Sequence, residues 1–139
     1  MKYLFDTNVI SEFVSARPNE RVIAWIDAVD PDSVYLSVVT IGELAKGIAK
    51  LSESVRKTAL HRWLTEDLLI RFEDRILALN VPVMLAWGEL TGRLERSGRP
   101  LPAMDSLIAA VALYHQCTLV TRNDVDFRDT GVPVLNPWL

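Results

Sequence analysis

Three carboxylates stand beside stretches that predict secondary structure: Asp6, Glu43 and Asp105. Asp6 directly follows the apolar run 3–5, and Glu43 comes shortly after the apolar run 34–37. Asp105 opens the most apolar helical stretch of the chain. Carboxylates held close together repel one another unless a cation lies among them, and their oxygens suit Mg²⁺ or Mn²⁺. Because such ions activate water and stabilise the charge developing on a phosphodiester, the pattern predicts a hydrolytic site whose acids are metal ligands, one of them also a base.

Each of these acids also has a purely structural interpretation. Asp6 can belong to a turn or helix cap, since it precedes Thr7 and Asn8. Thr40 and Glu43 have the spacing of a capping box, and an acid such as Asp105 is favoured near a helix N-terminus. A shared site explains the three acids together, because all three fall at the same predicted edge of one sheet.

A further pair of acids, Asp124 and Asp126, lies in the segment 121–127, just past a predicted strand. Either one alone is typical of a solvated loop. Both are nevertheless candidates for the same catalytic cluster, because this segment also reaches the predicted carboxyl edge of the sheet.

Short apolar strands alternate with helices in the predicted element order. The strands are predicted at residues 3–5, 34–37, 76–79, 118–120 and 132–135, and the helices at residues 8–14, 19–29, 39–51, 54–69, 82–97 and 104–116. Asn8 and Asn19 are predicted helix caps, and Gly98 a helix stop. The order predicts an α/β fold, a three-layer α/β/α sandwich with a central parallel sheet of four to five strands. Ligands of such sheets bind outside the carboxyl ends of the strands.

The bulk composition sets limits on the function. The chain has 139 residues, half of them apolar, which suits a single domain covering residues 1–139. Its net charge of −3 argues against a protein that coats nucleic acid non-specifically. It has one cysteine, Cys117, and no stretch of the ~20 apolar residues that a membrane span needs. We therefore expect a soluble, cytoplasmic protein without a membrane partner.

Several motifs, in this order, resemble those of the PIN-domain ribonucleases, and in particular the FitB-like branch of the VapC toxins from type II toxin–antitoxin modules. The motifs are Leu4-Phe5-Asp6-Thr7-Asn8-Val9-Ile10-Ser11, Thr40-Ile41-Gly42-Glu43-Leu44, Asp105-Ser106-Leu107-Ile108-Ala109-Ala110, Thr121-Arg122-Asn123 with Asp126-Phe127, and the ending Asn136-Pro137-Trp138. The resemblance covers nearly the whole chain. It implies a PIN-like fold and a ribonuclease that uses Mg²⁺ or Mn²⁺.

The same resemblance implies a role for individual residues. Asp6 and Asp105 would be the principal metal ligands, with Glu43 completing the set of acids. The family's fourth acid falls where this chain has Asn123, so that Asp124 or Asp126 would have to compensate, and the binding of a second ion is in question. The residues that would support the site or the cofactor are Thr7, Asn8, Thr121 and Asn123.

Partners are also implied by the resemblance. They are an RNA substrate, typically tRNA or rRNA, a cognate antitoxin of the VapB or FitA type, and a second copy of the chain in a homodimer. Tryptophans are enriched at interfaces, and this chain has four, Trp25, Trp63, Trp87 and Trp138. The basic candidates for contact with RNA phosphates are Lys46, Lys50, Arg93, Arg96 and Arg99.

Two other functions remain open on the sequence. A different Mg²⁺-dependent phosphohydrolase is one, but a phosphatase of the haloacid dehalogenase type needs a second aspartate where Asn8 stands. A receiver domain needs an acid pair and a late lysine that are not apparent. The other is a PIN-like module that binds RNA or a partner without cutting, which the change to Asn123 leaves possible.

Overall fold

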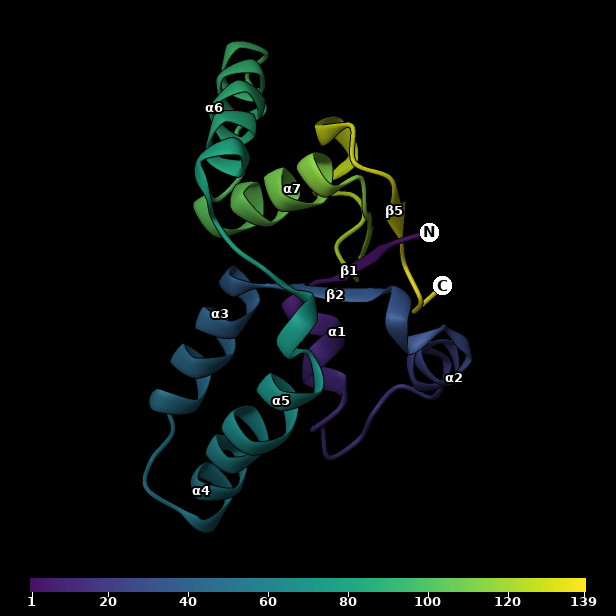
Figure 1. The fold of residues 1–139 in the computed structure, drawn as a ribbon, viewed down its shortest axis with the longest axis vertical. Helices are drawn as coiled ribbons and strands as arrows, with labels where there is room; N and C mark the ends of the chain where they lie inside the picture. Colours follow the sequence, from purple (N-terminus) through teal and green to yellow (C-terminus); the bar gives the residue numbers. More distant parts are fainter.

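A five-stranded parallel sheet forms the centre of the computed structural model, which describes residues 1–139 (Figure 1). Its strands are β1 (Tyr3–Phe5), β2 (Val34–Ser37), β3 (Ile76–Leu77), β4 (Thr118–Val120) and β5 (Val134–Leu135). Their spatial order is β3-β2-β1-β4-β5, with Tyr3 paired to both Val34 and Thr118. The predicted α/β/α class and the parallel sheet are confirmed.

Helices cover both faces of this sheet. They are α1 (Thr7–Glu12), α2 (Glu20–Ala28), α3 (Val38–Ala49), α4 (Val55–Arg62), α5 (Leu69–Arg71), α6 (Val81–Arg96) and α7 (Ala103–His115). In Figure 1, α6 and α7 lie above the sheet, whereas α3, α4 and α5 lie below it. None of these helices has the length and apolar character needed to cross a membrane.

Successive residues of a strand pack into two different hydrophobic cores, one on each face of the sheet. Leu4 and Leu119 pack with α6 and α7, and their neighbours Phe5 and Val120 pack with α1 to α4. All four side chains are almost completely buried. Side chains alternate between the two faces of a strand, so strands that are apolar at every position require helices on both sides.

The boundaries show three differences from the predicted elements. The third and fifth strands are shorter than expected, because only Ile76–Leu77 and Val134–Leu135 pair with neighbours. The helix predicted over 54–69 contains a π-helical segment, Trp63–Leu68, between α4 and α5. The predicted cap Asn8 is wrong, because Asp6 caps α1, whereas Asn19 caps α2 as expected.

Candidate active site

Asp6 lies at the carboxyl end of the central strand, in a fixed orientation. Its backbone N–H donates to the carbonyl of Val120 at 2.9 Å, which continues the pairing with β4. Its Oδ1 accepts from the N–H of Thr7 at 2.7 Å, and its Oδ2 accepts from the Thr121 hydroxyl at 2.8 Å. Only 5% of Asp6 is exposed. Two neighbouring strands thus hold one buried carboxylate at the edge of the sheet.

Glu43 reaches the same edge from α3, which begins directly after β2. The N-cap of this helix is Ser37, whose hydroxyl accepts from the N–H of Thr40 at 3.2 Å. The capping-box interpretation of Thr40 and Glu43 is therefore wrong. Glu43 Oε1 instead accepts from the Thr7 hydroxyl at 2.6 Å. This bond joins the segment after β1 to the helix after β2.

Asp105 lies in the first turn of α7, which leads into β4. A helix that returns the chain to the amino end of a parallel strand must begin at the carboxyl edge, where Asp6 lies. The residue at the N-cap is Pro102, and no side chain caps α7. Asp105 thus forms no capping bond, although its position near the N-terminus is electrostatically favourable for an acid.

The carboxylates at this edge act on one another electrostatically. Burial raises the pKa of Asp6 above its usual value, and the charge of Glu43 raises it further, against the lowering effect of its hydrogen bonds to Thr121 and Thr7. The pKa of Asp105 is raised by burial and then by Asp6, Glu43 and Asp126. The chain has two ion pairs, Lys57–Glu53 and Arg99–Asp129, so none of these four acids has a cation partner.

The sequence left Asp124 and Asp126 as alternatives, and these two acids have different surroundings in the segment after β4. Asp126 is exposed and close enough to raise the pKa of Asp105. The Asp124 carboxylate instead accepts from Asn136 Nδ2 at 3.1 Å. Asp126 is therefore the acid of this segment that faces the cluster, and Asp124 is bonded to the end of the chain.

Asn8 and Thr121 connect this segment to Asp6. Asn8 Nδ2 donates to the Thr121 hydroxyl at 3.3 Å, and Asn8 Oδ1 accepts from the N–H of Arg122 at 3.3 Å. The N–H of Asn123 donates to the Thr121 hydroxyl at 3.1 Å, whereas the residue itself is exposed. Asn8, Thr121 and Asn123 thus form hydrogen bonds beside Asp6, and Asn123 contributes through its backbone.

Asn136 has a position that sequence reasoning missed. Its Nδ2 also donates to the carbonyl of Arg122 at 3.1 Å, and its Oδ1 accepts from the N–H of Trp138 at 2.9 Å. The motif Asn136-Pro137-Trp138 is the sequence signal at this position, but it does not indicate these contacts. An amide residue directly after the last strand of a parallel sheet is a candidate to bond the neighbouring loop.

A divalent cation fits the donor chemistry of this edge. The acids supply oxygen ligands and lack a protein cation, which is the situation that a bound metal relieves. No three His, Cys, Asp or Glu side chains converge closely enough to ligate one ion together. Mg²⁺ commonly keeps several waters and takes only one or two carboxylates, so two carboxylates, such as those of Asp6 and Asp105, would be enough to hold it.

The parallel sheet and the acidic carboxyl edge define an α/β protein of the PIN-like type. Residues 3–133 match the family described as PIN domain, and the chain belongs to that family.

The relatives within this family are toxins and ribonucleases. The chain is 40% identical to "Toxin FitB" of Neisseria gonorrhoeae over 135 residues, which is 97% of each chain. It is 33% identical to "VapC ribonuclease Y4jK" of Sinorhizobium fredii, over 97% of this chain and 96% of that one. The relatives that carry ribonuclease names support a nuclease.

Solved structures show the same fold. The structure of FitAcB from Neisseria gonorrhoeae matches with a TM-score of 0.93 and 40% identity over 98% of both chains. A toxin–antitoxin complex from Klebsiella pneumoniae matches with a TM-score of 0.72 and 26% identity over 98% of both chains. The expected PIN-like architecture is therefore confirmed by structure as well as by sequence.

Proposed function

We propose that this protein is the toxin of a toxin–antitoxin pair and a metal-dependent endoribonuclease that uses Mg²⁺ or Mn²⁺. The observation that carries the proposal is the buried Asp6, which lies close to other carboxylates, none of which forms an ion pair with a protein cation. Burying an acid in this way is costly unless a ligand compensates. The names of the relatives support RNA as the substrate.

The site residues have distinct tasks in this proposal. Asp6 and Asp105 would hold the cation, which when bound would supply an activated water and stabilise charge on the phosphodiester. Thr7 and Thr121 orient the carboxylates of Glu43 and Asp6 through short hydrogen bonds. Asp126, exposed beside Asp105, would be the base that accepts a proton from the attacking water.

The experiment compares RNA cleavage by the native chain and by Asp6→Ala, each with Mg²⁺ and with a chelator. We expect cleavage only by the native chain with Mg²⁺. Equal cleavage in all four reactions would refute the catalytic site. A native chain that binds structured RNA without cutting it would favour the non-catalytic module, and hydrolysis of a chromogenic phosphomonoester instead of RNA would favour another phosphohydrolase.

An antitoxin is the proposed protein partner. The support is the structural match to a toxin–antitoxin complex from Klebsiella pneumoniae, together with the relative named as a toxin. Co-expression of the chain with the product of a neighbouring short reading frame should yield a stable complex and suppress RNA cleavage. Unchanged cleavage in such a complex would contradict the assignment.

A homodimer is proposed as well. The first turns of α6 expose the apolar residues Val81 (72%), Met84 (37%) and Leu85 (69%), which is a surface suited to a second copy. Light scattering of the purified chain should give twice the monomer mass, and Leu85→Glu should return it to the monomer. A native chain that is monomeric at micromolar concentration would overturn this assignment.

A further inference from the structure

Two lysines flank the acidic site on the side of α3. A hollow of about 530 Å³ lies between α3 and the start of α7, and Glu43, Lys46 and Lys50 line it. These three residues recur at the spacing of one helix face. Neither lysine takes part in an ion pair. The hollow also has apolar walls, including Met104 and Leu107, against which a nucleobase can pack.

An arginine lies beside two of the acids in a separate hollow. A second hollow, of about 270 Å³, is lined by Arg99 together with the site acids Asp105 and Asp126. The backbone of Arg99 is fixed, because its N–H donates to the carbonyl of Leu94 at 2.8 Å after Gly98 turns the chain with a φ of 71°. Arg99 is thus presented at a set position beside two of the carboxylates.

The Arg99 guanidinium is held in place but not saturated. Its Nη1 donates to Asp129 Oδ1 at 2.9 Å, and 63% of the side chain is exposed. Because a guanidinium has five N–H donors, most of them remain available to an incoming anion. Arginine is well suited to phosphate for this reason.

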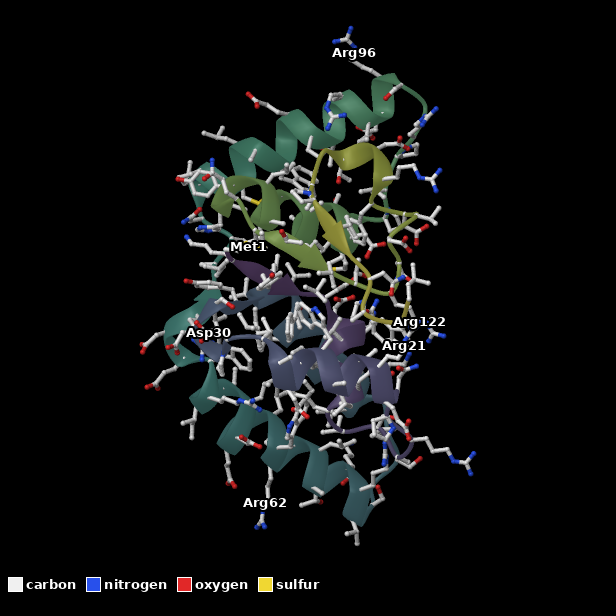
Figure 2. All side chains as sticks on the ribbon, turned by 90° about the vertical axis from the view of Figure 1, so that its right-hand side faces the viewer. Met1, Arg21, Asp30, Arg62, Arg96 and Arg122 are labelled. Atoms are coloured by element: carbon white, nitrogen blue, oxygen red, sulfur yellow. The ribbon has the colours of Figure 1, made fainter.

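The other arginines named as RNA candidates are less suitable. Arg93 uses its guanidinium to bond the carbonyls of Asp129 and Thr130 at 3.1 Å each. Arg96 lies at one end of the molecule (Figure 2). Lys46, Lys50 and Arg99 are therefore the candidates that share a hollow with a site acid.

We propose that a single strand of RNA crosses the acidic site from one hollow to the other, with its phosphates bound by Lys46 and Lys50 on one side and by Arg99 on the other. This inference rests on the proposed ribonuclease function and adds the path of the substrate. A chain with a net charge of −3 does not attract RNA through its overall charge. Local cations on both sides of the acids supply the attraction that the acids themselves oppose.

The test measures binding, separately from cleavage. A fluorescently labelled, unstructured oligoribonucleotide is titrated with protein in chelator, and Kd is determined over a series of KCl concentrations. Each lost phosphate contact reduces the slope of log K against log salt by about 0.7 for a single strand. We expect a reduction of about 1.4 for the double variant Lys46→Ala/Lys50→Ala and about 0.7 for Arg99→Ala.

Matched variants separate phosphate binding from loss of structure. Asp129→Ala breaks the same ion pair as Arg99→Ala but leaves the arginine, so it should bind RNA as tightly as the native chain or more tightly. Arg62→Ala removes the same charge at a distant site, at one end of the molecule (Figure 2), and should leave the slope unchanged. Circular dichroism melts verify that each variant is folded.

Four results would overturn the proposed path. The first is that the native chain does not bind RNA, and the second is that the distant control variant weakens RNA binding as much as the test variants do. The third is that Arg99→Ala and Asp129→Ala weaken RNA binding equally. The fourth is that the lysine variant changes its oligomeric state but not its RNA binding, which would assign the α3 hollow to a second copy of the chain. Normal Mg²⁺-dependent cleavage with unaltered binding in every variant would refute the path alone, whereas binding without cleavage by the native chain would refute only the ribonuclease function.

Discussion

Replacing Asp105 by asparagine should stabilise the metal-free protein. Asp105 is half-buried and near Asp6, Glu43 and Asp126, and each of these charges raises its pKa in addition to the effect of burial. Asparagine has nearly the same shape and removes the repulsion. Because Asp105 makes no capping bond, little is lost in exchange.

The magnitude follows from the charges and the exposure. Two like charges about 4 Å apart repel by about 1 kcal/mol in water and about 4 kcal/mol near a protein surface, and the partial exposure of Asp105 places the effect toward the lower end. We expect a gain on the order of 1 kcal/mol in the free energy of unfolding. For a chain of 139 residues, that raises Tm by about 3–5 °C.

The gain should depend on pH in a defined direction. The pKa of Asp105 in the folded state is raised above its ordinary value of 3.8, so the native aspartate costs stability as the pH rises through that folded pKa. Below about pH 3.8 the carboxyl is protonated in both states, and the native chain and Asp105→Asn should differ little. The difference should reach its full size at neutral pH.

Thermal melts in chelator and in Mg²⁺, at acidic and neutral pH, test this reasoning. Mg²⁺ should raise the Tm of the native chain by binding the folded state and should raise that of Asp105→Asn much less. Asp67→Asn is a matched control, since Asp67 is exposed and belongs to neither ion pair, and it should shift stability by less than about 0.5 kcal/mol. A loss of several kcal/mol in Asp105→Asn without metal would show that the acid is structural and would refute the account.

Three further predictions concern the residues that hold the acids. Thr121→Val removes the hydroxyl that lowers the pKa of Asp6. The pKa of Asp6 should therefore rise further in this variant, as measured by a carbon-13 NMR titration of the metal-free chain. An unchanged pKa of Asp6 would contradict the role of that bond. Thr7→Val removes the 2.6 Å bond to Glu43. It should lower kcat for RNA about tenfold, since a hydrogen bond to a charged group is worth roughly 1.5–3 kcal/mol. The control Thr65→Val changes a surface hydroxyl that bonds only the carbonyl of His61 and should leave kcat unchanged. Asn136→Ala removes two bonds to the segment after β4 and should destabilise the protein by about 1–2 kcal/mol in urea unfolding, an effect that a loss below about 0.3 kcal/mol would exclude.

Much of the fold could be predicted because the pattern of apolar residues indicates which elements are buried in the core. Strands with successive apolar residues, such as Leu4–Phe5 in β1 and Leu119–Val120 in β4, require a sheet covered on both faces. The alternation of such strands with helices then leads to a parallel sheet. The lengths of β3 and β5 were missed because pairing depends on the neighbouring strand and leaves no mark on the strand's own composition.

The candidate acids and the polar residues beside them could be named from the sequence, but the hydrogen bonds that connect them could not. Asp6, Glu43 and Asp105 stand out because each is a charge beside an apolar element. Caps are local competitions between nearby side chains, which is why Ser37 rather than Thr40 caps α3. The choice between Asp124 and Asp126 depended on Asn136, twelve residues from Asp124, and only the folded chain brings these residues together.

The central claim is that carboxylates from distant segments hold one divalent cation. Crystals of the native chain soaked in Mn²⁺, with diffraction data collected at the manganese absorption edge, test it most directly. We expect a peak of anomalous density between Asp6 and Asp105 that is absent in crystals of Asp105→Asn. A native crystal without a peak at these carboxylates, or with manganese bound only elsewhere, would contradict the account.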